Sequence, residues 1–235
     1  MQTGKVYLLP TVLHDDALQT IPAYVLNAVK DCQVFFTENE RTARRFLKSI
    51  WREMVIDEYQ WFTIHKAEEE VKQSFLKLLK EGRNIGIISE AGCPGIADPG
   101  QLLVEAAQQH HMVVTPLVGP SSILLALMAS GMNGQCFQFH GYLPIDAQER
   151  KKKLKELENA SLKPQCTQLF IETPYRNNPL IKDILQTLHD DTRLCIAVDI
   201  TAASESILTK TIREWKKNIP DIHKRPAIFL VQAGK

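Results

Sequence analysis

Apolar residues in the first half of the chain alternate between short β-branched runs and longer stripes at helical spacing. The short runs predict strands at 6–10, 32–37, 54–56, 85–88 and 112–116. Helical spacing predicts helices that begin after Thr20 and after Gly100 and others that span 42–51 and 68–81. Because strands and helices take turns, we predict βαβ units and a mostly parallel sheet.

The second half of the chain repeats this alternation. The run 123–129 is apolar on all sides, which predicts a buried helix where two domains meet. Further strands are predicted at 137–140, 168–172, 194–200, 206–208 and 227–231. Helices are predicted from 150 onward, at 179–189 and around Glu214. The pattern therefore predicts an α/β protein with two α/β domains, 1–117 and 118–235.

Composition places the chain among ordinary globular proteins. It has 235 residues, 44% hydrophobic and 23% charged, and a formal net charge of +1. That charge gives no whole-chain argument for binding nucleic acid or an anionic membrane. The five cysteines form no C-x-x-C pair, which favours small core residues in a reducing compartment over zinc or disulfides. We expect no metal site.

Membrane spans and export signals both require long apolar runs. No run reaches 18 apolar residues, so we expect no membrane span. The first residues lack a long apolar stretch of the signal-peptide kind. We therefore expect a cytoplasmic protein.

The stretch Ser89–Gly100 is the main candidate for chemistry. It holds three glycines, two prolines and the carboxylates Glu90 and Asp98 between a predicted strand and a predicted helix. It has neither the G-K-[ST] ending of a P-loop nor the G-x-G-x-x-G spacing of a dinucleotide loop. Its carboxylates would repel phosphate, so a nucleoside or a cation suits it better. The alternative is a connector whose glycines only make turns.

A second loop, 117–122, also follows a predicted strand and precedes a predicted helix. In a parallel sheet, both loops would open on the same edge, where ligands of α/β proteins bind. Ser121 and Ser122 supply hydroxyl and backbone N–H groups at a helix start, although helix capping alone would also explain them.

The ordered motifs resemble those of a known family. The stretch 88–100 closely resembles a signature of the tetrapyrrole-methylase-like (class III) S-adenosylmethionine methyltransferases. The resemblance is strongest to the branch that methylates a cytidine ribose 2′-hydroxyl in small-subunit ribosomal RNA. Further segments resemble that branch in the same order, at 7–11, 38–41, 116–122, 139–144 and 170–176. The chain departs from it at Val12–Asp15, where relatives carry a glycine–asparagine pair, and at Glu90, where they carry aspartate.

This resemblance implies two α/β domains with S-adenosylmethionine in the cleft between them, in a homodimer. Backbone groups of the two loops suit the polar parts of the cofactor, and Glu90 is the first candidate for an electrostatic contact. Ile171 and Ala227 are candidates for walls of the adenine pocket. The candidate cofactor-binding residues are Pro10, Ser89, Glu90, Ala91, Gly92, Cys93, Ser121, Ser122, Ile171 and Ala227.

Methyl transfer to oxygen depends mainly on positioning the acceptor, and a base can remove the hydroxyl proton. The candidate bases are Glu38 and Glu172, with Arg41 and Arg176 orienting the substrate or a phosphate. Each of the four could equally serve in an ion pair or at a helix end. Basic residues along 41–52, 150–155 and 216–225 would contact RNA if they share a face, and would otherwise be solvated helix surface.

Three functional hypotheses follow from the sequence. The first is methylation of an RNA ribose 2′-hydroxyl, in small-subunit ribosomal RNA. The second is methylation of a small, tetrapyrrole-like acceptor. The third, which the altered segment Val12–Asp15 suggests, is a family member that binds the cofactor or RNA without catalysis.

Overall fold

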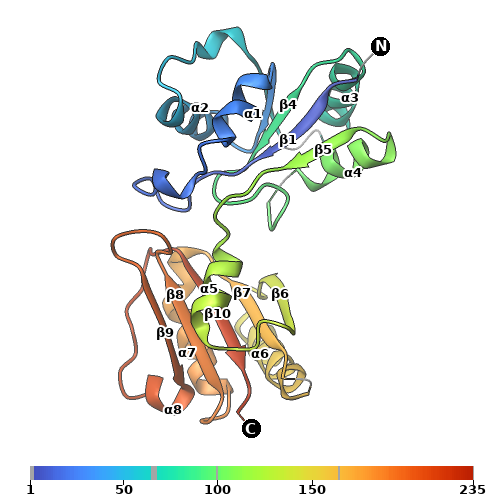
Figure 1. Ribbon diagram of the computed structural model, residues 1–235. Helices are drawn as coiled ribbons and strands as arrows, with labels where there is room; N and C mark the ends of the chain where they lie inside the picture. Colours follow the sequence, from blue (N-terminus) through green and yellow to red (C-terminus); the bar gives the residue numbers. More distant parts are fainter. Residues whose placement is uncertain (1–2, 65–67, 99, 164, 235) are drawn as a thin grey trace. The chain divides into compact units, whose positions relative to one another are not determined.

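The chain divides into two compact units, Met1–Ser121 and Ser122–Lys235 (Figure 1). The computed structural model describes residues 3–64, 68–98, 100–163 and 165–234, so Pro99 of the first loop lies outside the described residues. The predicted boundary at 117/118 falls in the connection between the last strand of the first unit and the first helix of the second. Each unit is an α/β layer structure of its own.

The first unit is built on a sheet whose described strands are all parallel, as the alternation predicts. Its spatial order is β3-β2-β4-β1-β5. The strands are β1 (Lys5–Leu9), β2 (Val34–Thr37), β3 (Gln60–Thr63), β4 (Ile85–Ile88) and β5 (Val113–Pro116). The strand β4 is central, because Ile88 aligns with Leu9 of β1 on one side and Thr37 of β2 on the other.

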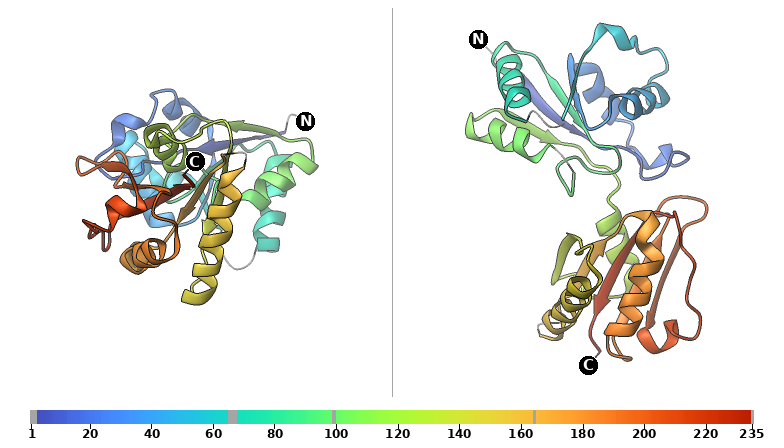
Figure 2. Two further views of the ribbon diagram at one scale, coloured as in Figure 1. Left: turned by 90° about the horizontal axis from the view of Figure 1, so that it is seen from below. Right: turned by 180° about the vertical axis from the view of Figure 1, so that it is seen from behind.

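Helices cover both faces of this sheet (Figure 2). The helices α1 (Val25–Asp31) and α2 (Glu40–Ile50) pack on the face that holds Leu9, Phe35 and Ile88. The helices α3 (Glu68–Lys80) and α4 (Gln101–Gln109) cover the opposite face, with side chains that include Phe36, Phe75, Ile87 and Leu103. Burial on both sides explains why β4 is a continuous apolar run instead of an alternating one.

The predicted strand at 54–56 is wrong. Residues Ile56–Glu58 form a 3-10 turn, and the strand β3 begins only at Gln60. Aromatic contacts across β2 and β3 fix this register. Phe35 stacks on Trp61 with ring centroids 4.9 Å apart, and Phe36 stacks on Phe62 at 4.7 Å. These aromatics therefore pack within the first unit.

The second unit holds a mixed sheet, which the sequence pattern does not reveal. Its order is β6-β7-β10-β8-β9, and β10 runs antiparallel to both β7 and β8. Its strands are β6 (Phe137–Tyr142), β7 (Thr167–Ile171), β8 (Arg193–Val198), β9 (Ser206–Thr211) and β10 (Ala227–Gln232). The helices α6 (Ala147–Leu162) and α7 (Asn177–Thr187) cover one face, and the short helix α8 (Ile212–Trp215) follows β9.

The helix α5 (Ser122–Ser130) lies on the other face of this sheet (Figure 1). The apolar sequence predicts a helix that is buried where two domains meet. The sheet of the second unit buries Ala126 and Leu127, whereas Leu124 is 52% exposed and Met128 is 78% exposed. The second unit by itself therefore leaves one apolar side of α5 uncovered.

The basic run at the start of α6 contains one buried member. The Arg150 Nε donates to Asp183 Oδ2 of α7 at 2.8 Å, and Arg150 Nη1 donates to the carbonyl of Ile145 at 2.7 Å. Both side chains of this pair are almost fully buried. Lys151 reaches the same carboxylate at 3.4 Å, from a half-exposed position. Arg150 therefore joins α6 to α7 and is not part of the solvated basic surface.

We expect Arg150→Ala to lower the free energy of unfolding by about 3 kcal/mol, because it leaves the Asp183 carboxylate buried without its main partner. Lys151→Ala removes a half-exposed partner of the same carboxylate and should cost less than about 1 kcal/mol. Urea denaturation of both variants measures the difference. Equal, small losses would contradict the structural role of the Arg150 pair.

Candidate functional site

The candidate site lies at the carboxyl edge of the first sheet. Because the strands are parallel, the segments after β1, β2, β4 and β5 leave from the same edge. The strands β1 and β4 are neighbours, yet they lead to helices on opposite faces of the sheet. Such a switch opens a crevice at the strand ends, and ligands of α/β proteins bind there.

Three hydrogen bonds position the loop after β4. The Thr11 backbone N–H donates to the Gly92 carbonyl at 2.9 Å, and the Glu38 N–H donates to the Ile88 carbonyl at 3.2 Å. The Thr11 hydroxyl lies 3.5 Å from the Ser89 carbonyl. Gly92 has a φ of +77°, which glycine adopts without strain. The segment Ser89–Gly92 is therefore held between the ends of β1 and β2.

The two loops predicted to share an edge do meet there. The Cys93 Sγ lies 3.5 Å from the Pro120 carbonyl and 3.9 Å from that of Gly119. Gly119 packs against Pro10 so closely that an added Cβ would stand 2.1 Å from the proline Cβ. Only glycine permits this approach. Pro10, Cys93 and the Gly119 loop thus form one contact cluster.

Three carboxylates face this edge. Glu38 Oε2 accepts a hydrogen bond from the Glu90 backbone N–H at 3.3 Å, and the Thr42 hydroxyl lies 3.4 Å from Glu90 Oε1. Burial raises the pKa of Asp98 to about 6, with further increases from the charges of Glu38 and Glu90. The hydroxyl of Ser89 partly offsets these effects and lowers the pKa of Asp98. The three side chains therefore share one electrostatic environment.

Most of the cations of α2 are already engaged. Arg44 pairs with Glu40 and lies over the Trp61 ring, 5.0 Å from its centroid. Arg45 pairs with Asp15 at 3.3 Å, and Lys48 Nζ donates to the Arg52 and Met54 carbonyls. Arg41, in the first turn, is exposed and makes no ion pair within the described part of the chain. It is the α2 cation that can meet a ligand without breaking a contact.

The predicted residues of the second unit also gather at one sheet edge. Ile171 ends β7 beside Ile228, and Ala227 begins β10 next to it. Glu172 follows Ile171, and its Oε1 accepts from Arg176 Nε at 2.9 Å and from the Thr173 N–H at 2.7 Å. Its Oε2 is buried and lacks a hydrogen-bond partner among the described residues. Glu172 is thus a buried carboxylate that pairs with the partly exposed Arg176 and keeps one oxygen without a partner among the described residues.

The candidate cofactor residues fall into two groups. Pro10, the segment 89–93 and Ser121 belong to the first unit, and Ser122 opens the second, which also holds Ile171 and Ala227. Within each unit, the members lie at the sheet edges described above, or at the start of α5 for Ser122. Their assignment to the cofactor remains a prediction.

The structure adds two residues to the site that the sequence gives no role. These are Thr11, which holds the loop after β4, and Gly119, which allows the close contact with Pro10. No local pattern indicates these contacts, because they join segments that are distant in sequence. For Asp98, which the sequence already offers as a carboxylate of the candidate stretch, the structure adds the partly buried environment that raises its pKa.

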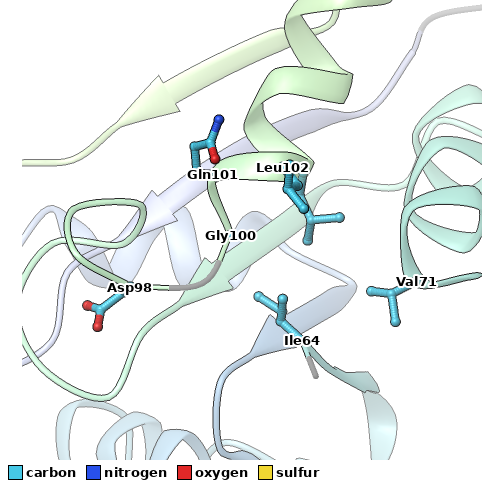
Figure 3. A pocket seen from close by; sticks show the side chains of 7 residues that line it. Ile64, Val71, Asp98, Gly100, Gln101 and Leu102 are labelled. Carbon is cyan, nitrogen blue, oxygen red and sulfur yellow. The ribbon is translucent and has the colours of Figure 1, made fainter. Parts of the chain in front are cut away.

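A cavity of about 220 Å³ is lined by Asp98, by Ile64 and Val71, and by the first turn of α4 (Figure 3). Apart from Asp98, its walls are mainly aliphatic. The Asp98 carboxylate points away from Ile64 and Val71 in this view. Asp98 therefore lies between this cavity and the group of carboxylates.

Among the described residues, no group of three or more His, Cys, Asp or Glu side chains could hold a metal ion. In the same part of the chain, no helix has the length and apolar character needed to cross a membrane.

Comparisons with known proteins match most of the chain. The family model of the Tetrapyrrole (Corrin/Porphyrin) Methylases matches residues 16–216. A Haemophilus influenzae protein named Ribosomal RNA small subunit methyltransferase I is 29% identical over 98% of this chain and 79% of its own length.

Solved structures share the fold at low sequence identity. The methyltransferase CobJ has a TM-score of 0.64 at 15% identity, covering 99% of this chain and 95% of its own. Uroporphyrin-III C-methyl transferase from Thermus thermophilus, complexed with S-adenyl homocysteine, has a TM-score of 0.58 at 15% identity, with 97% of both chains covered. At this identity, the likeness establishes the two-unit α/β fold.

The elevated pKa of Asp98 predicts a defined pH dependence of stability. In the unfolded chain, an aspartate has a pKa of about 3.9, whereas folding raises the pKa of Asp98 to about 6. The folded state binds this proton more tightly, so the contribution of Asp98 to stability is lost as the pH rises from about 4 to about 6. Asp98→Asn should therefore stabilise the protein by on the order of 1 kcal/mol at pH 8 and not at pH 4.

Urea denaturation across this pH range measures the effect, with Glu105→Gln as the control. Glu105 lies on α4, is exposed, and accepts a hydrogen bond from Gln109 and from no other described residue. Its variant should follow the wild type at every pH. A stabilisation by Asp98→Asn that does not vary with pH would contradict the assignment.

Proposed function

Because the chain belongs to the tetrapyrrole (corrin/porphyrin) methylase family, we propose that it methylates the ribose 2′-hydroxyl of a cytidine in small-subunit ribosomal RNA, using S-adenosylmethionine. The observation that carries this proposal is the signature loop after β4. It lies at the carboxyl edge of the parallel sheet, held against Thr11 and the Gly119 loop. Small-subunit ribosomal RNA is proposed as the acceptor because the relative from Haemophilus influenzae, which matches 98% of this chain, is named for methylating it.

The residues at this edge fit the cofactor chemically. The sulfonium and ammonium groups of S-adenosylmethionine are cations, and Glu38, Glu90 and Asp98 are carboxylates without a cationic partner among the described residues. The Thr37 hydroxyl oxygen, at the end of β2, is buried without a hydrogen-bond partner in the same part of the chain. A buried polar atom of this kind is costly unless a ligand pairs with it.

In this proposal, the first unit holds the cofactor through Pro10, Ser89–Cys93 and Ser121. Ser122 contributes from the start of α5, and Ile171 and Ala227 form an apolar wall for the adenine. When bound, S-adenosylmethionine supplies an electrophilic methyl group. The chain itself must exclude water from that group and hold the acceptor hydroxyl in line with it.

Glu38 is the proposed base. Its Oε2 is occupied by the Glu90 N–H, whereas its Oε1 has no hydrogen-bond partner among the described residues. That oxygen would take the proton of the acceptor hydroxyl as the methyl group leaves the cofactor's sulfur for the hydroxyl oxygen. Glu172 holds Arg176 instead, so the two act as a pair that orients the substrate. Arg41 contacts a phosphate, because it is the α2 cation with no ion-pair partner among the described residues.

Ribosomal subunits occupy the cytoplasm, so the proposal places the protein there. Its proposed form is a homodimer. Support comes from α5, where Leu124 and Met128 lie one turn apart and are 52% and 78% exposed. An exposed apolar pair of this kind on an otherwise packed helix is typical of an interface between chains.

A tritiated-methyl assay on small ribosomal subunits from a strain that lacks this protein tests the proposed function. We expect label on a cytidine ribose 2′-oxygen and an affinity that falls steeply as salt rises, because phosphate contacts release counterions. Failure to bind S-adenosylmethionine at millimolar concentration would contradict the proposal as a whole. Activity that needs no RNA and ignores salt would favour a small-molecule acceptor.

Arg41→Ala is the sharpest variant for the RNA contact, with Arg45→Ala as its matched control. Both arginines lie on the same helix and are exposed, but Arg45 is paired with Asp15. We expect Arg41→Ala to reduce the slope of log affinity against log salt by about one. Arg45→Ala should leave that slope nearly unchanged. Equal effects would mean that Arg41 has no special place in the interface.

Sedimentation equilibrium tests the dimer. The wild type should sediment as a dimer at micromolar concentrations, and the double variant Leu124→Glu, Met128→Glu as a monomer. Ile145→Glu is the control, since Ile145 is an exposed apolar residue elsewhere in the second unit. A monomeric wild type would refute the dimer and leave the methyltransferase proposal standing.

A further inference from the structure

An exposed aromatic ring stands at the carboxyl edge of the second sheet. The strand β7 ends at Ile171, and the chain then forms a 3-10 turn, Pro174–Arg176, that leads into α7. Tyr175, in the middle of this turn, is 67% exposed. The neighbouring Arg176 is held by Glu172, with the Arg176 Nε 2.9 Å from Glu172 Oε1. The Tyr175 ring is therefore open to solvent beside a cation whose position is fixed.

Two exposed residues of the loop before β10 flank this ring. The His223 ring meets Tyr175 nearly edge-on, at an interplanar angle of 75°, with ring centroids 6.1 Å apart. The Lys224 Nζ lies 5.8 Å from the centroid of the Tyr175 ring, which is a cation–π distance. The Lys224 backbone N–H donates to the Pro174 carbonyl at 3.0 Å and so joins the loop to the turn. We call Tyr175, His223 and Lys224 the Tyr175 platform.

Side chains at the start of α7 hold the platform in place. The Asn177 Nδ2 donates to the Arg225 carbonyl at 2.7 Å, and Asn178 Oδ1 accepts from the Ile222 N–H at 3.0 Å. Lys224 has a φ of +64°, a left-handed conformation that costs a lysine energy. The hydrogen bonds on both sides of Lys224 maintain that conformation. The platform is therefore preorganised, which lowers the entropy cost of binding a partner.

The charges of the basic segment 216–225 favour a nucleic acid as that partner. Lys216 is paired with Asp190 at 2.6 Å. Arg225 is likewise paired with Asp199, at 2.8 Å. Lys224, in contrast, makes no ion pair within the described residues and is free to meet an anion. An open aromatic ring beside a free cation matches a nucleotide, which has a flat base and an anionic phosphate.

We propose that the Tyr175 platform stacks on an unpaired base of the ribosomal RNA, with Lys224 at the phosphate of the same or an adjoining nucleotide. This inference rests on the proposed function and adds to it the contact by which the second unit recognises the substrate. Every base has a flat π face, so such stacking tolerates different sequences. In a duplex the bases stack on one another instead, so the platform selects unpaired RNA.

Filter binding of the full chain to small ribosomal subunits, taken from a strain that lacks this protein, tests the stacking. Tyr175→Ala should weaken the affinity roughly tenfold, whereas Tyr175→Phe, which keeps the ring, should stay within about twofold of the wild type. Tyr175→Leu keeps the bulk but not the π face, and should lose as much as Tyr175→Ala. Phe137→Ala is the control, because Phe137 is an exposed aromatic residue at the opposite end of the same sheet.

The salt dependence of the same affinity separates stacking from charge. Lys224→Ala should reduce the slope of log affinity against log salt by about 0.7, because a contact to a single-stranded phosphate releases counterions. Tyr175→Ala should leave the slope unchanged, since stacking releases none. Lys216→Ala is the control for charge and should also leave the slope nearly unchanged, because Asp190 already engages Lys216.

The other outcomes are each decisive. Equal affinities of Tyr175→Leu and Tyr175→Phe would reduce the platform to an apolar contact and overturn the inference. It would also be overturned if Tyr175→Ala lost its calorimetric binding of S-adenosylmethionine, which would place Tyr175 in the cofactor site. A Tyr175→Ala variant that binds the subunits normally would overturn it as well, and conversion of a dimeric wild type to a monomer by that substitution would assign the ring to a second copy of the chain.

The proposed function fails in a different way. A wild type that binds the subunits but transfers no methyl group to them would count against the proposed function and leave the stacking measurements valid. A wild type that methylates the subunits, with an affinity that Tyr175→Ala does not change, would overturn the inference and leave the proposed function standing.

Discussion

The central strand β4 imposes the constraint on which the candidate site depends. Its last residue, Ile88, is paired with β1 on one side and with β2 on the other, and helices cover both faces of the sheet. The chain can leave such a strand only at the carboxyl edge. The polar segment that follows is therefore delivered between Thr11 and Glu38, where backbone hydrogen bonds fix it. A parallel sheet with buried faces thus turns one loop into a positioned site.

Charge is distributed unevenly around that edge, and the distribution suggests a division of roles. The cations of α2 are mostly engaged with Glu40, Asp15 or backbone carbonyls, and Arg41 is the exception. The carboxylates of Glu38, Glu90 and Asp98 remain without cationic partners in the described chain. In the proposed function, the carboxylates meet the cationic cofactor and Arg41 meets the phosphate of the acceptor. In this proposal, the negatively charged side chains therefore bind the cationic cofactor, and the positively charged Arg41 binds the anionic RNA backbone.

Much of the fold could be predicted from the sequence, because alternating strands and helices have local patterns. The parallel first sheet and the shared edge of the two loops followed from that alternation. The predicted strand at 54–56 is wrong, because the aromatic pairs between β2 and β3 place the strand at Gln60–Thr63 instead of at the short apolar run. The mixed strand directions of the second sheet could not be predicted, since the direction of β10 depends on pairing with strands distant in sequence.

The candidate site was less predictable, because its parts meet through tertiary contacts. The signature loop pointed to Ser89 and Glu90, but only the structure shows the approach of Gly119 to Pro10 and the clasp by Thr11. The environment of Asp98 depends on burial and on two carboxylates from other segments. The basic residues beside Arg150 in the sequence suggest that it lies on a solvated basic surface. In the structure, Arg150 is instead buried and paired with Asp183.

Amide hydrogen exchange with and without S-adenosylmethionine tests most directly whether the carboxyl edge of the first sheet is the cofactor site. In the first unit, the account predicts slower exchange at Thr11, in the segment 89–93 and around Gly119, with the far ends of the same strands unchanged. Protection absent from this edge, or confined to the aliphatic cavity beside α4, would contradict it.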